Sequence, residues 1–248
     1  MYTVVFIRHG ESTWNKENRF CGWVDQDLTE EGKVEARQAG EALKASGIEF
    51  GALFTSVLKR AINTADIVLE TLGQQGLPTV RHWRLNERHY GALQGLNKVE
   101  TAEKYGLEQV NLWRRSYNVP PPPCAEDSEY HPKNDTMYND IPRDAVPNGE
   151  SLELVVKRVL PYWDEVVVPE MKKGKPVLVV AHGNTIRSLV KVIKNISDED
   201  ISGLNIPNGV PLLVTFNCDM TLNEYKFLIS EEELKAKMDA VAKQAQKK

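Results

Sequence analysis

The sequence lacks the features that would place a protein outside the cell or in a membrane. Its three cysteines, Cys21, Cys124 and Cys218, are scattered and show no CxxC spacing. That pattern is typical of reduced thiols in a cytosolic protein. Arg8 interrupts the first apolar run too early for a signal-peptide core, and no later stretch approaches the length of a membrane span. We therefore expect a cytoplasmic, soluble and globular protein.

A large excess of charge of one sign is also missing. The 31 basic and 35 acidic residues give a net charge of -4, which argues against nucleic acid as the main partner. The sequence has no HExxH motif and no paired Cys/His spacing, and the nearest histidines, His82 and His89, lie seven residues apart. We therefore expect no metal. If the protein binds an anion, a local cluster of basic residues must hold it.

Alternating strands and helices are what the sequence does contain. Apolar runs predict strands, and capping residues such as Thr29 and Gly47 bound the helices between them. The predicted strands are residues 3–7, 52–55, 78–82 and 176–181. This order predicts an α/β fold, a three-layer sandwich with a mainly parallel central sheet covered by helices on both faces.

We expect one domain, residues 1–229, followed by a lysine-rich C-terminal tail, residues 230–248. A Pro-rich segment at about residues 118–148 opens with four prolines and shows little periodicity. Strand–helix alternation resumes after it, so we interpret it as an insertion that lies over the sheet rather than as a linker.

Two histidines stand in matching places. His9 follows the first predicted strand, His182 follows the strand at 176–181, and a glycine comes after each. In a parallel sheet both side chains would emerge at the carboxyl edge, where such folds bind ligands. Adjacent strands lie about 4.8 Å apart, so the two imidazoles could flank one phosphate. We also expect the glycines to bring backbone N–H groups close to an anion.

Three groups of basic residues are candidates for the anion site. A predicted loop at residues 84–91 crowds cations around one carboxylate, Arg114 and Arg115 end a predicted helix, and Arg60 opens another. Guanidinium groups in such places bind carboxylate and phosphate. Each group could equally be a solvated charged surface, and these patterns alone leave that open.

Five blocks of sequence resemble, in the right order, the signature of the histidine phosphatase superfamily and, within it, the cofactor-dependent phosphoglycerate mutases. The blocks are Arg8–Asn15, Asn86–Gly91, Trp113–Ser116, Glu150–Leu152 and Ala181–Asn184. The resemblance spans residues 3 to about 216. It is poor over residues 124–146 and after Phe216, and Cys21 stands where the family more often has threonine.

The resemblance implies a role for each matching residue. His9 would be the phosphorylated nucleophile, His182 would stabilise the transferring phosphoryl group, and Glu87 would donate and accept the proton. The other implied residues are Arg8 and Arg60 on the phosphate; Ser12, Asn15, Gly183 and Asn184 as further hydrogen-bonding groups; Arg88, His89, Tyr90, Lys98, Arg114 and Arg115 around the substrate; and Cys21 and Gly22 near the glycerate backbone.

The implied activity is the interconversion of 3-phosphoglycerate and 2-phosphoglycerate in glycolysis and gluconeogenesis. A phosphohistidine enzyme primed by 2,3-bisphosphoglycerate would carry it out without a metal. The implied partners are small phosphoglycerates, with neither nucleic acid nor membrane, and a homo-oligomer is expected because family members are commonly dimers or tetramers.

Three alternatives stay open. A bisphosphoglycerate mutase (synthase) has the same fold but carries Gly and Ser where this chain has Ser12 and Gly22. A small-molecule phosphatase of the superfamily would have little need of Lys98 and the paired arginines. A catalytically inactive binding module would not need His9 and Glu87.

The tail itself has two interpretations. Its apolar positions, Leu234, Met238, Val241, Ala242 and Ala245, recur at helical spacing among lysines. It is either a solvated helix without a role or a lid that keeps water from the phosphohistidine.

Overall fold

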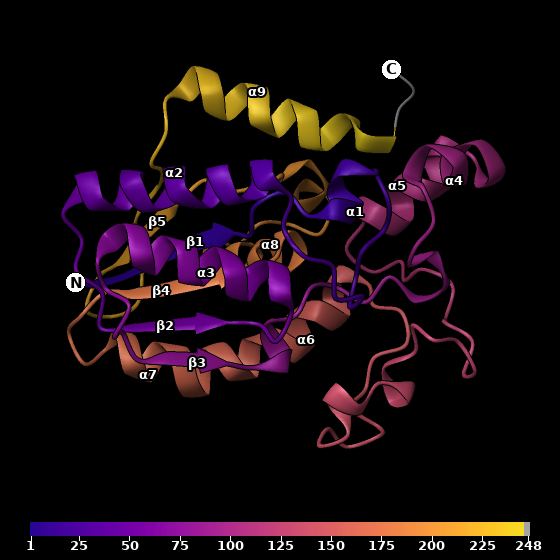
Figure 1. Ribbon diagram of the computed structural model, residues 1–248, viewed down its shortest axis with the longest axis horizontal. Helices are drawn as coiled ribbons and strands as arrows, with labels where there is room; N and C mark the ends of the chain where they lie inside the picture. Colours follow the sequence, from indigo (N-terminus) through magenta and orange to yellow (C-terminus); the bar gives the residue numbers. More distant parts are fainter. Residues whose placement is uncertain (246–248) are drawn as a thin grey trace.

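The computed structural model describes residues 1–245, and within them one six-stranded sheet lies between two layers of helices (Figure 1). The strand order is β3-β2-β4-β1-β5-β6. The strands are β1 (Tyr2–Arg8), β2 (Ala52–Thr55), β3 (Thr79–Arg81), β4 (Val177–Ala181), β5 (Leu212–Phe216) and β6 (Leu222–Phe227). The predicted α/β three-layer fold is confirmed.

Four strands form the parallel part of the sheet, and two antiparallel strands complete it. β1 and β2 both pair in parallel with β4, and β3 pairs in parallel with β2. β5 runs antiparallel to β1, and β6 runs antiparallel to β5. The four predicted strands correspond to β1–β4 within about a residue at each end, but the sequence reasoning did not place β5 or β6.

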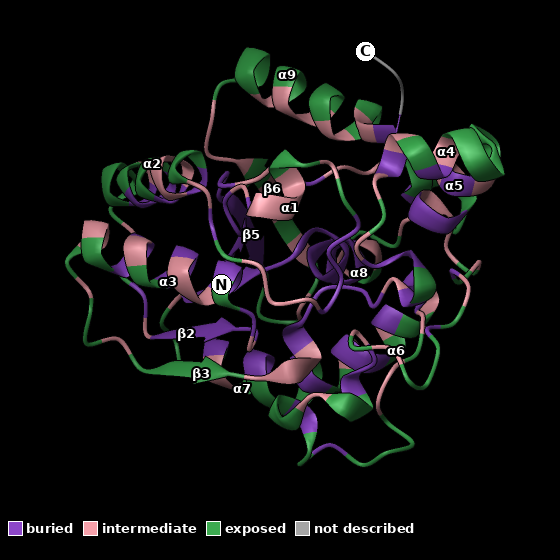
Figure 2. Ribbon diagram, turned by 45° about the vertical axis from the view of Figure 1, so that its right-hand side comes forward, coloured by how far each residue is buried: buried purple, intermediate pink, exposed green. Residues whose placement is uncertain are grey.

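Helices cover the sheet on both faces because strand residues alternate between them. On one face, Val5 and Ile7 of β1 pack with residues of α2 (Glu30–Ser46) and α3 (Lys59–Leu72). On the other, Val4 and Phe6 pack with α6 (Leu152–Tyr162), α7 (Val168–Met171) and α8 (Gly183–Ile193). Figure 2 shows the buried strands inside these layers. β1 and β4 are therefore the central strands.

The predicted ends of α2 match its structure. Thr29 is the N-cap, and its side chain accepts a hydrogen bond from the Gly32 N–H; Gly47, at φ 70°, is the C-cap. Other short elements are α1 (Thr13–Lys16), η1 (Trp83–Leu85), η2 (Gly91–Leu93), the π-helical turn η5 (Trp163–Val167) and η6 (Asp200–Gly203).

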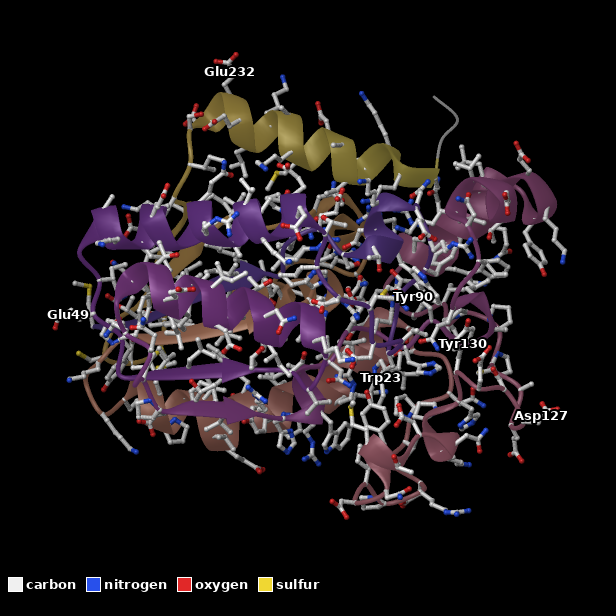
Figure 3. The ribbon with its side chains drawn as sticks, in the orientation of Figure 1. Trp23, Glu49, Tyr90, Asp127, Tyr130 and Glu232 are labelled. Atoms are coloured by element: carbon white, nitrogen blue, oxygen red, sulfur yellow. The ribbon has the colours of Figure 1, made fainter. Side chains whose placement is uncertain are left out.

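The segments beyond the carboxyl ends of the parallel strands build a cap over that end of the sheet. It begins with α4 (Lys98–Tyr105) and α5 (Leu107–Arg115), and the Pro-rich segment follows with two short turns, η3 (Pro132–Asn134) and η4 (Thr136–Tyr138). Tyr138 and Ile141 pack with Trp23 in a small apolar cluster, which anchors the segment. Figure 3 shows Trp23 and Tyr90 at this end of the sheet, Glu49 at the opposite end and Asp127 on the outer side of the segment.

The C-terminal tail crosses the outside of the molecule. α9 (Glu231–Ala242) runs along the outer side of α2 and, through η7 (Lys243–Ala245), reaches α4 and α5 (Figure 1). Ala245 is buried with Phe20 and Trp113. None of the helices in residues 1–245 is long and apolar enough to cross a membrane.

Candidate active site

The two histidines of the matching strand ends meet, as the sequence predicted. β1 and β4 are neighbours, with Arg8 opposite Ala181, so His9 and His182 leave the sheet side by side. Their ring centroids lie 5.0 Å apart at an interplanar angle of 60°. Both side chains are buried, with 2% and 0% of their surface exposed. The parallel pairing of two strands thus creates a pair of imidazoles at the carboxyl edge.

Hydrogen bonds fix the protonation of His9. Its Nδ1 lies 2.7 Å from the Gly10 carbonyl oxygen, which can only accept, so Nδ1 carries the proton. Nε2 then holds the lone pair, and it accepts from Nε of Arg60 at 3.3 Å. Burial, followed by the charges of Arg60 and Arg8, lowers the pKa of His9 well below its ordinary value. His9 is therefore a neutral imidazole with a nucleophilic nitrogen.

Ser56 holds the imidazole ring of His182 in place. Ser56 follows β2; its Oγ accepts from the Leu58 N–H at 3.2 Å and forms a hydrogen bond with Nε2 of His182 at 2.8 Å. Nδ1 of His182 has no hydrogen-bond partner among the described residues. Burial is the largest cause that lowers the pKa of His182 well below its ordinary value, and Arg60 comes next.

The glycine after His9 has a different use from the one expected. The Gly10 N–H donates to Oγ1 of Thr64 at 3.0 Å, so it is not offered to an anion. A Cβ at Gly10 would come within 2.1 Å of the Gly32 carbonyl oxygen. Gly10 therefore allows the chain after β1 to pass close to the first turn of α2, and the expectation of an anion-binding N–H there was wrong.

Arg60 is held rigidly beside His9. Besides its contact with His9, its Nη1 donates to the Val24 carbonyl at 2.9 Å and its Nη2 to the Gly22 carbonyl at 2.7 Å. Gly22 has φ 55°, and a Cβ there would lie 2.1 Å from Oε1 of Gln94. Glycine at this position therefore permits the close turn whose carbonyl orients Arg60.

Cations far outnumber carboxylates around the cavity next to His9. The basic residues that line it are Arg8, Arg19, Arg60, Lys98, Arg114, Arg115 and Arg187, and the acidic one is Glu87. Burial lowers the pKa of Lys98 well below its ordinary value, and Arg114 and Arg8 add to the effect. A cavity with this charge favours an anionic ligand, because the ligand relieves the repulsion between the buried cations.

Several buried guanidinium nitrogens in this region have no hydrogen-bond partner among the described residues. They are Nε of Arg8, Nε and Nη1 of Arg88, Nη1 of Arg114 and Nε of Arg187. Buried donors are usually paired. Three of these residues, Arg8, Arg114 and Arg187, line the same cavity, which indicates a site built for an acceptor-rich ligand such as phosphate or carboxylate.

Glu87 is the one carboxylate among the described residues that line the cavity. Its Oε1 accepts from the backbone N–H of Arg88 at 2.7 Å and from that of Asn184, in the first turn of α8, at 3.2 Å. Asn184 in turn donates to the Tyr90 hydroxyl at 3.2 Å and accepts from Arg187 at 2.8 Å. The carboxylate is thus oriented by backbone donors from two segments that lie far apart in the sequence.

The structure brings most of the predicted site residues to one cavity. Those that line it are Arg8, His9, Asn15, Cys21, Gly22, Arg60, Glu87, Tyr90, Lys98, Arg114, Arg115, Gly183 and Asn184. His182 is not part of the lining, but its ring lies against that of His9. Arg114 and Arg115 stand at the end of α5, where the sequence placed them.

Besides His182, three predicted residues lie outside the lining of the cavity. Ser12 is the N-cap of α1, and its side chain and that of Asn15 each bond the other's backbone N–H. Arg88 donates to the Arg114 carbonyl at 2.7 Å. His89 accepts from the backbone N–H of Gly91 and of Gly149, which holds the turn at η2 against the chain before α6.

The tail supplies cavity residues that the sequence reasoning did not assign. Oε1 of Gln244 accepts from Nζ of Lys98 and from Nη2 of Arg114, each at 3.2 Å. The Val241 carbonyl accepts from Nη2 of Arg115 at 3.2 Å. Both Val241 and Gln244 line the cavity, so the tail closes over the cations opposite His9.

Ser56 and Arg187 were also missed. Ser56 directly follows a predicted strand, so the rule that singled out His9 and His182 could have found it. Arg187 lies one turn into α8 and looks like an ordinary helix cation in the sequence. Its burial, at 2% exposure, follows only from the packing of α8.

The described residues contain no group of three or more His, Cys, Asp or Glu side chains that could hold a metal ion.

Comparison with known proteins gives one consistent result. The chain matches the family model described as "Histidine phosphatase superfamily (branch 1)" over residues 4–130 and 123–221. It is 51% identical over 248 residues, covering all of both chains, to the 2,3-bisphosphoglycerate-dependent phosphoglycerate mutase of Parabacteroides distasonis.

Two solved structures share the fold at lower identity. A mycobacterial glucosyl-3-phosphoglycerate phosphatase superposes with a TM-score of 0.68 at 23% identity, over 91% of this chain and 96% of the other. A putative alpha-ribazole-5'-P phosphatase from Escherichia coli gives a TM-score of 0.68 at 20% identity, over 93% and 98%.

Proposed function

We infer the function from the premise that the chain belongs to the histidine phosphatase superfamily, branch 1. We propose that it interconverts 3-phosphoglycerate and 2-phosphoglycerate through a phosphohistidine at His9, primed by 2,3-bisphosphoglycerate. The full-length identity of 51% to a mutase supports this activity.

One observation of the structure carries the proposal. The lone pair of His9 Nε2 lies against Arg60 in a cavity lined by several cations and one carboxylate. A nucleophilic nitrogen, fixed positive charge and a single proton carrier are what phosphoryl transfer through histidine requires.

The residues present fit a ligand with two phosphates and a carboxylate. The partnerless nitrogens of Arg8, Arg114 and Arg187, which line the cavity, offer donors to such an anion. Arg8 ends β1 next to His9, whereas Lys98 begins α4 and Arg114 and Arg115 end α5, in the cap over the sheet. Donors on both sides match a small molecule that carries a negative group at each end. When bound, 2,3-bisphosphoglycerate supplies the phosphoryl group that first loads His9.

The chain's own residues then perform two reciprocal steps. His9 Nε2 attacks phosphorus of the bound ester, the P–O bond breaks, and Glu87 gives its proton to the departing alkoxide. In the return step Glu87 takes a proton from the attacking hydroxyl, and the N–P bond breaks. Arg8, Arg60 and the imidazole of His182 stabilise charge on the phosphoryl oxygens.

The other predicted site residues keep substrate-binding roles in the proposal. Lys98, Arg114 and Arg115 hold the end of the substrate away from His9. Ser12, Arg88 and His89 act one layer further out, because they shape the loops that carry the lining residues. We also keep as proposals a domain over residues 1–229 with a separate tail, a cytoplasmic location and a homo-oligomer, which sedimentation would test.

The test of the function is a coupled assay of purified protein with 3-phosphoglycerate, with and without 2,3-bisphosphoglycerate. We expect turnover that needs the primer and is insensitive to EDTA. A phosphatase would release inorganic phosphate instead, and a synthase would accumulate free bisphosphate. Incubation with labelled primer should give acid-labile, base-stable label that is lost in His9→Ala. Label on serine would contradict the assignment.

A further inference from the structure

The loop that carries Glu87 has its own backbone clamp. Residues 84–89 begin within the 3₁₀ turn η1 (Trp83–Leu85). No strand pairs with them to bind their carbonyl groups. Buried carbonyls in such a loop need side-chain donors. Arg158 of α6 supplies donors to three of them.

All five N–H groups of Arg158 are used. Nη1 donates to the carbonyls of Arg84 at 2.7 Å and Asn86 at 3.1 Å, and Nη2 donates to that of Glu87 at 3.2 Å. The remaining two donors meet Glu150, from Nε at 2.7 Å and from Nη2 at 2.9 Å. One guanidinium thus binds three carbonyls of the loop at once.

Glu150 extends the clamp to the other side of Glu87. Its Oε2 also accepts from the backbone N–H of His89 at 2.8 Å. Trp23 adds a bond from Nε1 to the Glu87 carbonyl at 2.6 Å, and its ring lies against the guanidinium of Arg158. The peptide groups before and after the Glu87 side chain are therefore both tied to one ion pair.

The ion pair is too buried to be explained by stability alone. The side chains of Arg158 and Glu150 are 6% and 4% exposed. Desolvation of such a pair offsets much of its attraction, and apolar residues of similar size often serve stability as well. What the pair provides, and apolar residues cannot, is a fixed direction for the carbonyls around Glu87.

We propose that Arg158, held by Glu150, is a positioning residue for proton transfer by Glu87. The proposal rests on the proposed function, because it assumes that Glu87 serves a leaving alkoxide. Arg158 does not touch the substrate. It acts by holding the loop so that the Glu87 carboxylate stays at the oxygen that gains or loses a proton.

Lysine cannot replace Arg158 in this role. A lysine ammonium is a compact charge with three donors, whereas the guanidinium fork reaches five acceptors in one plane. Arg158→Lys keeps the positive charge but loses the simultaneous grip on three carbonyls. Misplacement of a catalytic group by about 1 Å can lower a rate by about 100-fold.

The experiment compares two phosphoryl donors in the same proteins, wild type and Arg158→Lys. Transfer from 2,3-bisphosphoglycerate to His9 expels an alkoxide that needs a proton, whereas transfer from p-nitrophenyl phosphate expels a stable phenolate that does not. Rapid-quench measurement of His9 phosphorylation follows both. We expect a loss of at least about tenfold with the first donor and a change within about threefold with the second.

Controls separate positioning from folding. Arg143→Lys changes an exposed arginine of the Pro-rich segment and should leave both rates unchanged. In a Glu87→Gln background, Arg158→Lys should have little further effect on alkoxide transfer, because both changes remove the same step. Glu150→Gln, which keeps an acceptor but loses the charge, should show the same contrast between donors with a smaller loss.

Equal loss with both donors, or no loss with either, in Arg158→Lys and Glu150→Gln would overturn the proposal. If Arg158→Lys does not fold, Glu150→Gln alone decides. Absence of mutase turnover in the wild type would instead refute the proposed function, and the comparison of alkyl and aryl donors would still stand on its own.

Discussion

The buried imidazole of His89 makes the stability of this protein sensitive to acid. Its Nδ1 accepts from the backbone N–H of Gly91 at 3.0 Å and of Gly149 at 3.1 Å. A proton on Nδ1 would break both bonds. Burial, with smaller effects of His131 and Arg158, lowers the pKa of His89 to about 3.

The sign of the effect follows from where the proton binds. The unfolded chain takes up a proton on this histidine near pH 6.5, whereas the folded protein resists it until far lower pH. The unfolded state therefore gains relative stability as the pH falls through 6.5. From pH 7.5 to pH 5, His89 alone should lower the free energy of unfolding by about 2 kcal/mol.

The matched variant is His89→Asn, whose Oδ1 can take the place of Nδ1 as the acceptor but does not titrate. Urea unfolding of both proteins at pH 7.5 and pH 5, at one protein concentration, measures the difference between them. The variant should be less stable at pH 7.5, because it loses the packed ring, and the gap should shrink by about 2 kcal/mol at pH 5. Carboxylates titrate in both proteins and cancel. A gap that does not change with pH would refute the reasoning.

Three further changes should affect activity. Glu87→Gln should lower turnover by about 10²–10⁴-fold with substrate still bound, because the amide cannot carry the proton; a loss under about tenfold in a steady-state assay would assign the proton to another group. Ser56→Ala should lower turnover by about five- to tenfold with little change in KM, because the His182 imidazole loses a bond worth about 1 kcal/mol, whereas the exposed control Ser46→Ala should match the wild type. Deletion of residues 231–248 should lower mutase turnover and spare or raise hydrolysis of 2,3-bisphosphoglycerate, because the contacts of Gln244 over the cavity are lost; an unchanged ratio of the two activities would mean that the tail is not a lid.

β1, β2 and β4 were predictable because each is a short, largely buried strand with its own apolar signal, whereas β3 is exposed. Val177–Ala181 is a continuous buried apolar run, as expected of a central parallel strand. β6 is only half-buried, with the burial of its residues alternating irregularly along Leu222–Phe227. It pairs with β5, which in turn pairs with β1. Such an antiparallel addition is decided by tertiary contacts rather than by local sequence.

The candidate site also contains residues whose place the sequence predicted and others whose place it did not. Residues at strand ends, such as His9 and His182, could be placed together because the parallel arrangement fixes where strand ends meet. Arg158 could not be placed with them, because three of its partners are backbone carbonyls at residues 84–87. Every residue has a carbonyl, so the sequence does not show which ones a side chain binds. The resemblance to known mutases likewise named the lining residues but not the clamp behind them.

The tail shows how charge pattern alone can mislead. A lysine-rich tail would be attracted to an anionic ligand, yet Lys237 faces Glu35 at 3.9 Å on α2, and Lys247 and Lys248 lie outside the described residues. The groups that reach the cavity are neutral acceptors, the side-chain oxygen of Gln244 and the carbonyl of Val241. Lysines there would be repelled by Lys98 and Arg114, whereas amide oxygens bind them. An anion that binds these cations must compete with Gln244 for the same donors, so the tail contact has to break or shift when the substrate occupies that end of the cavity.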